Sequence, residues 1–220
     1  KRAGCCVEAA GNGVFAMTMI RVGMSLAMLT LSAATAGANE SSYTDMNTDR
    51  CNTLSSNEEE GSSVSLKCRG LDGYPVYFKE GGARQSVFFG PVSQSYIDGG
   101  FESFGMFNYV GKKIEWRIDD SGTPVAAILR YFISNLDPET GMPTKALEGQ
   151  VLVISRVAQP DDESGCVAAY VDALANKDAN GLARQVADDM AANFTCGQDE
   201  PAFHGERGER ASEPSRYLPE

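Results

Sequence analysis

The sequence predicts an α+β fold: an antiparallel β-sheet of about six or seven short strands, with one C-terminal amphipathic helix packed on it. The first supporting observation is a hairpin pattern. Val151–Ile154 is apolar and largely β-branched, and after turn-forming residues at 160–165 the chain returns as Cys166–Val171. The second is a change of period, because apolar residues recur every three or four positions between 179 and 194. The third is a series of upstream segments in which polar and apolar residues alternate.

The predicted helix has clear end signals. Asp178 or Asn176 can cap its first turn by accepting a hydrogen bond from an unpaired backbone N–H. Gly197 lies just beyond its far end, where a residue in the left-handed conformation often stops a helix. The apolar face of this helix covers the sheet or, alternatively, docks a partner, and covering is the commoner role. The opposite face is expected to be solvated and carries Arg184, Gln185, Asp188 and Asp189.

The remaining strands follow from alternation and turn residues. They are expected at Ser62–Cys68, Val76–Phe78, Arg84–Phe89, Lys112–Ile118 and Val125–Ile133. In the segment before the Asp119–Gly122 turn, Trp116 should face the core while Glu115 and Arg117 face outward. Arg130 on the following strand is expected to pair with Glu115 across the hairpin.

The chain divides by composition into five parts. We interpret them in order as an upstream non-native segment, a signal peptide, a loose N-terminal arm, a single α+β domain and a disordered polar tail, over 1–16, 17–38, 39–61, 62–200 and 201–220. The signal peptide is predicted from one basic residue, Arg21, followed by an apolar run and small residues ending at Ala38. The alternative is a membrane anchor, but the run is short, so we expect no stable membrane span in the mature chain.

Four cysteines lie in the part that follows the signal peptide. An even number in an exported chain predicts two disulfides, and of the three possible pairings we expect Cys51–Cys68 and Cys166–Cys196, because each brackets one local unit. A metal site is the alternative, but no two of these cysteines are close enough to resemble a C-x-x-C zinc motif. We therefore expect no metal and no cofactor, and we place the protein in the periplasm or outside the cell.

The charge argues against polyanionic partners. The chain has a net charge of -11, and residues 39–220 carry 16 basic and 29 acidic side chains, or -13. Such a surface repels nucleic-acid phosphates, so no nucleic-acid partner is expected.

Ser93–Gly111 is the best candidate for a binding surface, because its aromatic residues alternate with glycines. The same residues can also simply pack on the sheet. Arg117 and Arg130 can bind an acidic ligand, although salt bridges explain them as well. The candidate binding residues are Tyr96, Phe101, Phe104, Phe107, Tyr109, Arg117 and Arg130.

No catalytic motif stands out. His204 is the single histidine, so neither a zinc motif of the H-E-x-x-H type nor a convincing nucleophile–histidine pair is present. Asp120–Thr123 matches a short aspartic-protease string, but it occurs once and a hairpin turn explains it. No catalytic residue is therefore assigned.

Three groups of residues together resemble the small exported alphaproteobacterial proteins of unknown function: Ile114–Arg117, Gly149–Arg156 and Tyr170–Arg184. The resemblance covers about 51–204 and implies a location and a fold, but no site residues. The most consistent function is a non-catalytic cell-envelope protein that binds an envelope protein or a small ligand. The alternatives are an inhibitor of a wall-degrading enzyme and a periplasmic hydrolase that uses a carboxylate pair.

Overall fold

A computed structural model describes residues 39–57 and 62–219 of the chain. These residues form a mostly β structure with one long helix near the C-terminus, α2 (Ala179–Met190), as the sequence predicts. The number of strands differs from the prediction, because the described residues contain twelve strands in three sheets instead of six or seven in one. Residues 1–38, including the segments interpreted as upstream sequence and signal peptide, lie outside the described residues.

The largest sheet has six strands in the order β1-β7-β8-β9-β10-β11. Its neighbours are antiparallel except for β10 and β11, which are parallel. The bounds are β1 Glu40–Asp45, β7 Asn108–Ile118, β8 Pro124–Ile133, β9 Gly149–Arg156, β10 Cys166–Asp172 and β11 Ala202–Phe203. The five predicted strand segments and the two strands of the predicted hairpin coincide with observed strands, apart from Ser62, and four of these seven strands lie in this sheet.

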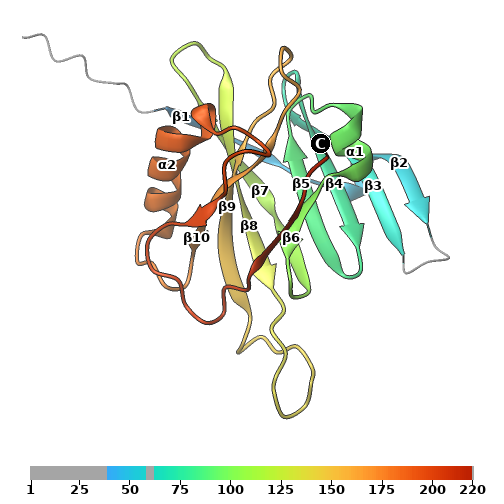
Figure 1. The fold of residues 1–220 in the computed structure, drawn as a ribbon, viewed down its shortest axis with the longest axis vertical. Coiled ribbons are helices and arrows are strands. Elements are labelled where there is room, and N and C mark those ends of the chain that lie inside the picture. Colours follow the sequence, from blue (N-terminus) through green and yellow to red (C-terminus); the bar gives the residue numbers. More distant parts are fainter. Residues whose placement is uncertain (1–38, 58–61, 220) are drawn as a thin grey trace, which may run out of the picture. The chain divides into compact units, whose positions relative to one another are not determined.

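Two smaller sheets complete the β structure. A four-stranded antiparallel sheet has the order β2-β3-β4-β5, with bounds Asn52–Asn57, Ser63–Leu71, Tyr74–Gly81 and Arg84–Phe89. A two-stranded sheet pairs β6 (Phe101–Phe104) with β12 (Pro214–Tyr217). The short helix α1 (Gln94–Gly99) connects β5 to β6, and Figure 1 shows it beside the four-stranded sheet. Two single-turn 3₁₀ helices cover Thr48–Arg50 and Ala191–Asn193.

One core lies between the four-stranded and six-stranded sheets. Trp116 on β7 is fully buried there, as predicted, and meets the ring of Phe89 on β5 edge to face at 5.5 Å. Its indole N–H donates to the Thr44 hydroxyl on β1 at 2.8 Å, which satisfies its polar atom inside the core. Because side chains alternate between the two faces of β5 and β7, large side chains from both sheets meet in one apolar layer.

The second core lies between α2 and the other face of the six-stranded sheet (Figure 1). Asp178 caps α2 as predicted, since its carboxylate accepts from the Gly181 N–H at 3.0 Å. Gly197 has a positive φ of 81°, but it lies beyond an intervening 3₁₀ turn and not at the end of α2. Because α2 covers this face, Glu115 and Arg117 are buried instead of facing solvent as the sequence predicted.

The helix face predicted to be solvated is partly used for contacts with the sheet. Asp188 accepts from both Nε and Nη2 of Arg117, at 2.8 and 2.6 Å, and Arg184 donates to Glu115 at 2.6 Å. The predicted Arg130–Glu115 pair is absent from the described residues, because β-strand register places Glu115 opposite Ile128. Burial on both faces of the sheet, which no local pattern reveals, is the reason for these differences.

Both predicted disulfides are confirmed. Cys51 bonds to Cys68 and Cys166 bonds to Cys196, so the first links the start of β2 to β3 and the second links β10 to the segment after α2. No cysteine of the described part of the chain is free. Two disulfides agree with an oxidising environment such as the periplasm or the cell exterior.

The arm and the tail are more ordered than the sequence suggested. Within the predicted arm, β1 and β2 each add a strand to the edge of a sheet. Within the predicted tail, β12 pairs along its whole length with β6, and Ala211 is buried. These segments have few apolar residues, so their order comes from backbone pairing and from polar side-chain contacts, which composition does not reveal. In the described ranges, no helix is sufficiently long and apolar to span a membrane.

Candidate functional site

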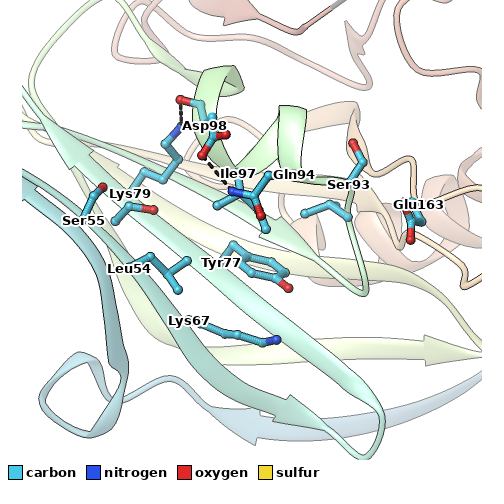
Figure 2. Close-up of a pocket in the computed structure, with 12 residues that line it drawn as sticks. Leu54, Ser55, Lys67, Tyr77, Lys79, Ser93, Gln94, Ile97, Asp98 and Glu163 are labelled. Carbon is cyan, nitrogen blue, oxygen red and sulfur yellow. Dashed lines mark hydrogen bonds between the residues drawn. The ribbon is translucent and has the colours of Figure 1, made fainter.

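A hollow lies between the four-stranded sheet and α1, and we call it the α1 cleft. Its volume is about 710 Å³, within the range of small-molecule sites. The strands β2, β3 and β4 provide its floor, and α1 with the residues just before it provides one wall (Figure 2). The lining residues used below are Ser65, Lys67, Tyr77, Lys79, Gln94 and Asp98.

Strand alternation explains the floor. Along β3 and β4, every second residue points into the core between the two large sheets, so the intervening residues point to the cleft. Tyr77 lies directly opposite Lys67, and the Lys67 ammonium is 5.5 Å from the centre of the Tyr77 ring. Figure 2 shows Tyr77 in the middle of the floor with Lys67 beside it. This arrangement joins a cation to an aromatic face.

The wall is fixed by packing on the same sheet. Tyr96 of α1 meets Phe88 of β5 edge to face at 5.9 Å. At Gly100, just after α1, an added Cβ would come within 2.9 Å of the Phe88 ring, so only glycine lets the chain approach the sheet this closely. Lys79 on β4 then holds the end of the helix, because its ammonium donates to the carbonyls of Gly100 at 2.7 Å and Asp98 at 3.3 Å.

Two charged groups beside the wall are already bonded to the protein. Partial burial lowers the pKa of Lys79, and the carboxylate of Asp98 partly opposes this shift. The Asp98 carboxylate accepts from the side-chain amide of Gln94 at 2.9 Å, a contact drawn in Figure 2. Lys79 is therefore a structural cation that anchors α1, and it is less available to a ligand than Lys67.

Two polar groups on the floor are not satisfied by the protein. Ser65 is only 6% exposed, and its buried hydroxyl oxygen has no hydrogen-bond partner. Lys67 is exposed, forms no ion pair with a carboxylate in the described ranges, and places its ammonium over the Tyr77 ring. A buried polar group without a partner costs free energy, so an unpaired hydroxyl in a cleft indicates a place for a ligand group.

The seven residues predicted to bind do not form one surface. Phe104 is buried against Tyr131 and Tyr170. Phe101 is half-buried, and Tyr96 of α1 packs against Phe88. Phe107 and Tyr109 are exposed, by 49% and 37%. The role of the seven residues in binding stays a prediction, since only some of them are buried away from solvent.

The two predicted arginines have different surroundings. Arg117 is buried beneath α2 and paired with Asp188, so it is a structural cation. Arg130 instead lines a second hollow of about 430 Å³ on the α2 side of the six-stranded sheet. The wall residues of the α1 cleft from Ser93 to Asp98 lie within the predicted segment Ser93–Gly111, but the floor is not predicted, because Ser65, Lys67 and Tyr77 look like the outward positions of ordinary strands.

The cleft offers little for hydrolysis by a carboxylate pair. Its two acidic residues are Asp98 and Glu163, and Figure 2 shows them at opposite ends of the lining. Asp98 is bonded to Gln94, whereas Glu163 is exposed in a loop. The protease-like string at Asp120–Thr123 forms the predicted hairpin turn, in which Asp119 accepts from the backbone N–H groups of Ser121 and Thr123. No cluster of potential metal ligands occurs in the part of the chain described by the structure.

No family model, curated protein or solved structure matches this chain.

Proposed function

We propose that the protein is an exported, non-catalytic binding protein whose α1 cleft holds a small polyhydroxylated organic acid. The observation that carries this proposal is the buried, unpartnered hydroxyl of Ser65 beside Lys67. A ligand carboxylate can accept from both groups, so it would satisfy the hydroxyl and the free ammonium together. Export is supported by the two disulfides.

The rest of the lining favours a hydroxyl-bearing ligand. Ser55, Ser93 and Gln94 offer neutral hydrogen-bonding groups, and the carboxylates of Asp98 and Glu163 accept from hydroxyls. Tyr77 and Ile97 add apolar area on which the carbon skeleton of a sugar acid can rest. Because both signs of charge are present, a simple inorganic anion would use only one part of the site.

The experiment is a titration of ¹⁵N-labelled protein with glucuronate, with glucose as the uncharged counterpart. We expect glucuronate to shift the backbone amide signals of Ser65, Lys67 and Tyr77, and glucose to shift them much less. Lys67→Gln should weaken glucuronate binding roughly tenfold, since it removes a charge-assisted hydrogen bond. Lys177→Gln is the matched control, because Lys177 is an exposed lysine outside the cleft lining.

Ser65→Ala separates binding from stability. The substitution removes a buried hydroxyl that has no partner, so the free protein should become more stable by about 1 kcal/mol. The same change should weaken glucuronate binding, because the ligand loses a donor. Equal binding of glucose and glucuronate, or a Ser65→Ala protein that is less stable and binds normally, would contradict the proposal.

A further inference from the structure

The second hollow is created by an irregularity in β7, and we call it the bulge pocket. Val110 pairs with Tyr131 and Ile114 pairs with Leu129, so three residues of β7, 111–113, stand opposite the single residue Arg130 of β8. The extra residues interrupt the pairing of β7 with β8 at Lys112 and Lys113, and both side chains are exposed. Gly111 makes the close approach possible, because a Cβ there would come within 3.3 Å of the Arg130 carbonyl oxygen.

The bulge pocket has an apolar floor. Ile128 and Leu152 are buried beneath it, and Phe132 is half-buried beside them. The Phe132 ring stacks on Tyr109 at 4.8 Å, which holds it in place. The volume of about 430 Å³ is sufficient for a ligand of about one ring with a short side chain.

Its rim is strongly basic in an otherwise acidic protein. Four basic side chains line the pocket, Lys112, Lys113, Arg130 and Arg184, against the single acidic residue Glu115. Burial opposes ionisation of Glu115, but hydrogen bonds from Arg184 and Ser41 outweigh it and lower the pKa, so Glu115 is a carboxylate. Lys113 is paired with Asp45 at 2.8 Å. After these pairs are counted, Arg130 and Lys112 are left without a carboxylate.

Arg130 is the more informative of the two, because it is half-buried. Its guanidinium donates to Gln150 at 3.0 Å and to Asn180 at 3.3 Å, and both partners are neutral side chains. No acidic side chain within the described ranges pairs with it, and burial lowers its pKa. A partly buried cation that faces a hollow without a counter-ion is costly, and a bound anion would remove that cost.

We propose that the bulge pocket binds a small apolar carboxylate, with the carboxylate on Arg130 and Lys112 and the apolar body against Phe132, Ile128 and Leu152. Arginine suits this role, since its planar fork donates two parallel bonds to a carboxylate. The inference is independent of the α1 cleft, which is lined by different residues on different strands.

The test uses three ligands of nearly equal shape: phenylacetate, phenylacetamide and phenethylamine. Titrated into ¹⁵N-labelled protein at constant ionic strength, phenylacetate should shift the Nε–Hε signal of Arg130 and the amides of 111–113. The neutral amide should bind at least about tenfold more weakly, and the amine should not bind, because it meets like charge.

Arg130→Gln should reduce phenylacetate affinity roughly tenfold, whereas Arg69→Gln should leave it unchanged. Arg69 is a suitable control, since its side chain is 94% exposed and it lies outside the pocket. Lys112→Gln is the second variant if Arg130→Gln does not fold, because Lys112 is exposed and forms no ion pair in the described structure. It should weaken phenylacetate to a smaller extent.

Three results would overturn the inference. Equal affinity for phenylacetate and phenylacetamide would show that the pocket does not recognise the negative charge of the ligand. Unchanged binding in Arg130→Gln, or in Lys112→Gln where that variant replaces it, would show that the basic rim is not used. Shifts confined to Ser65 and Lys67 would place the carboxylate in the α1 cleft instead, a result that would support the proposed function while it removed this second site.

Discussion

At the scale of single residues, the most unusual carboxyl group is Glu102 on β6. It is 2% exposed, and it accepts from the Val167 N–H at 2.7 Å and from Nε of Arg216 at 2.8 Å. Burial raises its pKa from 4.5 to about 7, because the desolvation of the charged form exceeds the effect of these two donors. Glu102 therefore links the last strand, β12, to the body of the protein through a group that titrates near neutral pH.

This shift predicts a pH dependence of stability. Between pH 4.5 and about 7 the unfolded chain has lost the Glu102 proton while the folded protein keeps it. The free energy of unfolding should therefore fall as the pH rises through this window, by about 3 kcal/mol. Urea unfolding from pH 4 to 8 measures the fall.

Glu102→Gln should remove this pH dependence, although it also lowers stability by about 1–3 kcal/mol because an amide cannot accept from both donors. The slope, and not the absolute stability, is the diagnostic quantity. Glu206→Gln is the control, since Glu206 is exposed and its carboxylate forms no ion pair in the described residues. A slope that persists in Glu102→Gln would assign it to other groups.

At the scale of elements, α2 is held on the sheet by charge as well as by apolar packing. Arg117 is buried and Asp188 mostly so, with side-chain exposures of 5% and 21%. Removing one partner leaves a buried charge, so Asp188→Ala should destabilise the protein by about 3 kcal/mol. The double variant Arg117→Met/Asp188→Leu should recover most of this loss, because neither charge then remains buried.

Chemical unfolding of the single and double variants measures both effects. Asp189→Ala provides the control, since Asp189 is the exposed neighbour on the same helix. If the double variant is less stable than Asp188→Ala, apolar residues cannot replace the pair, and the arrangement of its hydrogen bonds would be essential to α2.

Local patterns predicted the elements that carry an apolar signal. The strands β3, β4, β5 and β7–β10 and the helix α2 with its cap follow directly from alternation and from the 3.6-residue period. The strands β1, β2 and β12 are polar sequences whose order comes from backbone pairing with distant edges, so no short window reveals them. The floor of the α1 cleft is not predicted for a related reason: it consists of the polar positions of ordinary strands, and these line a cleft only because α1 packs beside them.

The sequence predicts one residue of the bulge pocket. Arg130 as a ligand for an acidic group stays a prediction, whereas the predicted pairing of Arg130 with Glu115 across the hairpin is not observed. The bulge at 111–113 changes the register of β7 against β8, and α2 brings Arg184 to Glu115 instead. Glu115 stands opposite Ile128 on the turn side of this bulge and pairs with Arg184, so Arg130 is left with the neutral partners Gln150 and Asn180. A regular alternating pattern gives no sign of this arrangement.

At the scale of the whole molecule, the two disulfides stabilise different parts of the structure. Cys166–Cys196 closes 30 residues and holds the segment after α2 against β10, whereas Cys51–Cys68 closes 17 residues and holds β2 on the edge of its sheet. Every residue of β2 is exposed, so this strand has little apolar burial to keep it in place. It nevertheless supplies Leu54 and Ser55 to the α1 cleft.

The two bonds should therefore separate stability from binding. In the chain-entropy relation, loops of these sizes contribute about 3–4 kcal/mol each to the free energy of unfolding. For Cys166→Ala/Cys196→Ala we expect urea unfolding to show this decrease in the free energy of unfolding. The α1 cleft of the protein that remains folded should bind glucuronate with little change. For Cys51→Ala/Cys68→Ala we expect a smaller loss, because β2 can detach by itself, and a clear loss of glucuronate binding. Hydrogen exchange of the β2 amides measures that detachment directly. Protected β2 amides in Cys51→Ala/Cys68→Ala would show that backbone pairing with β3 suffices to hold this part of the cleft floor.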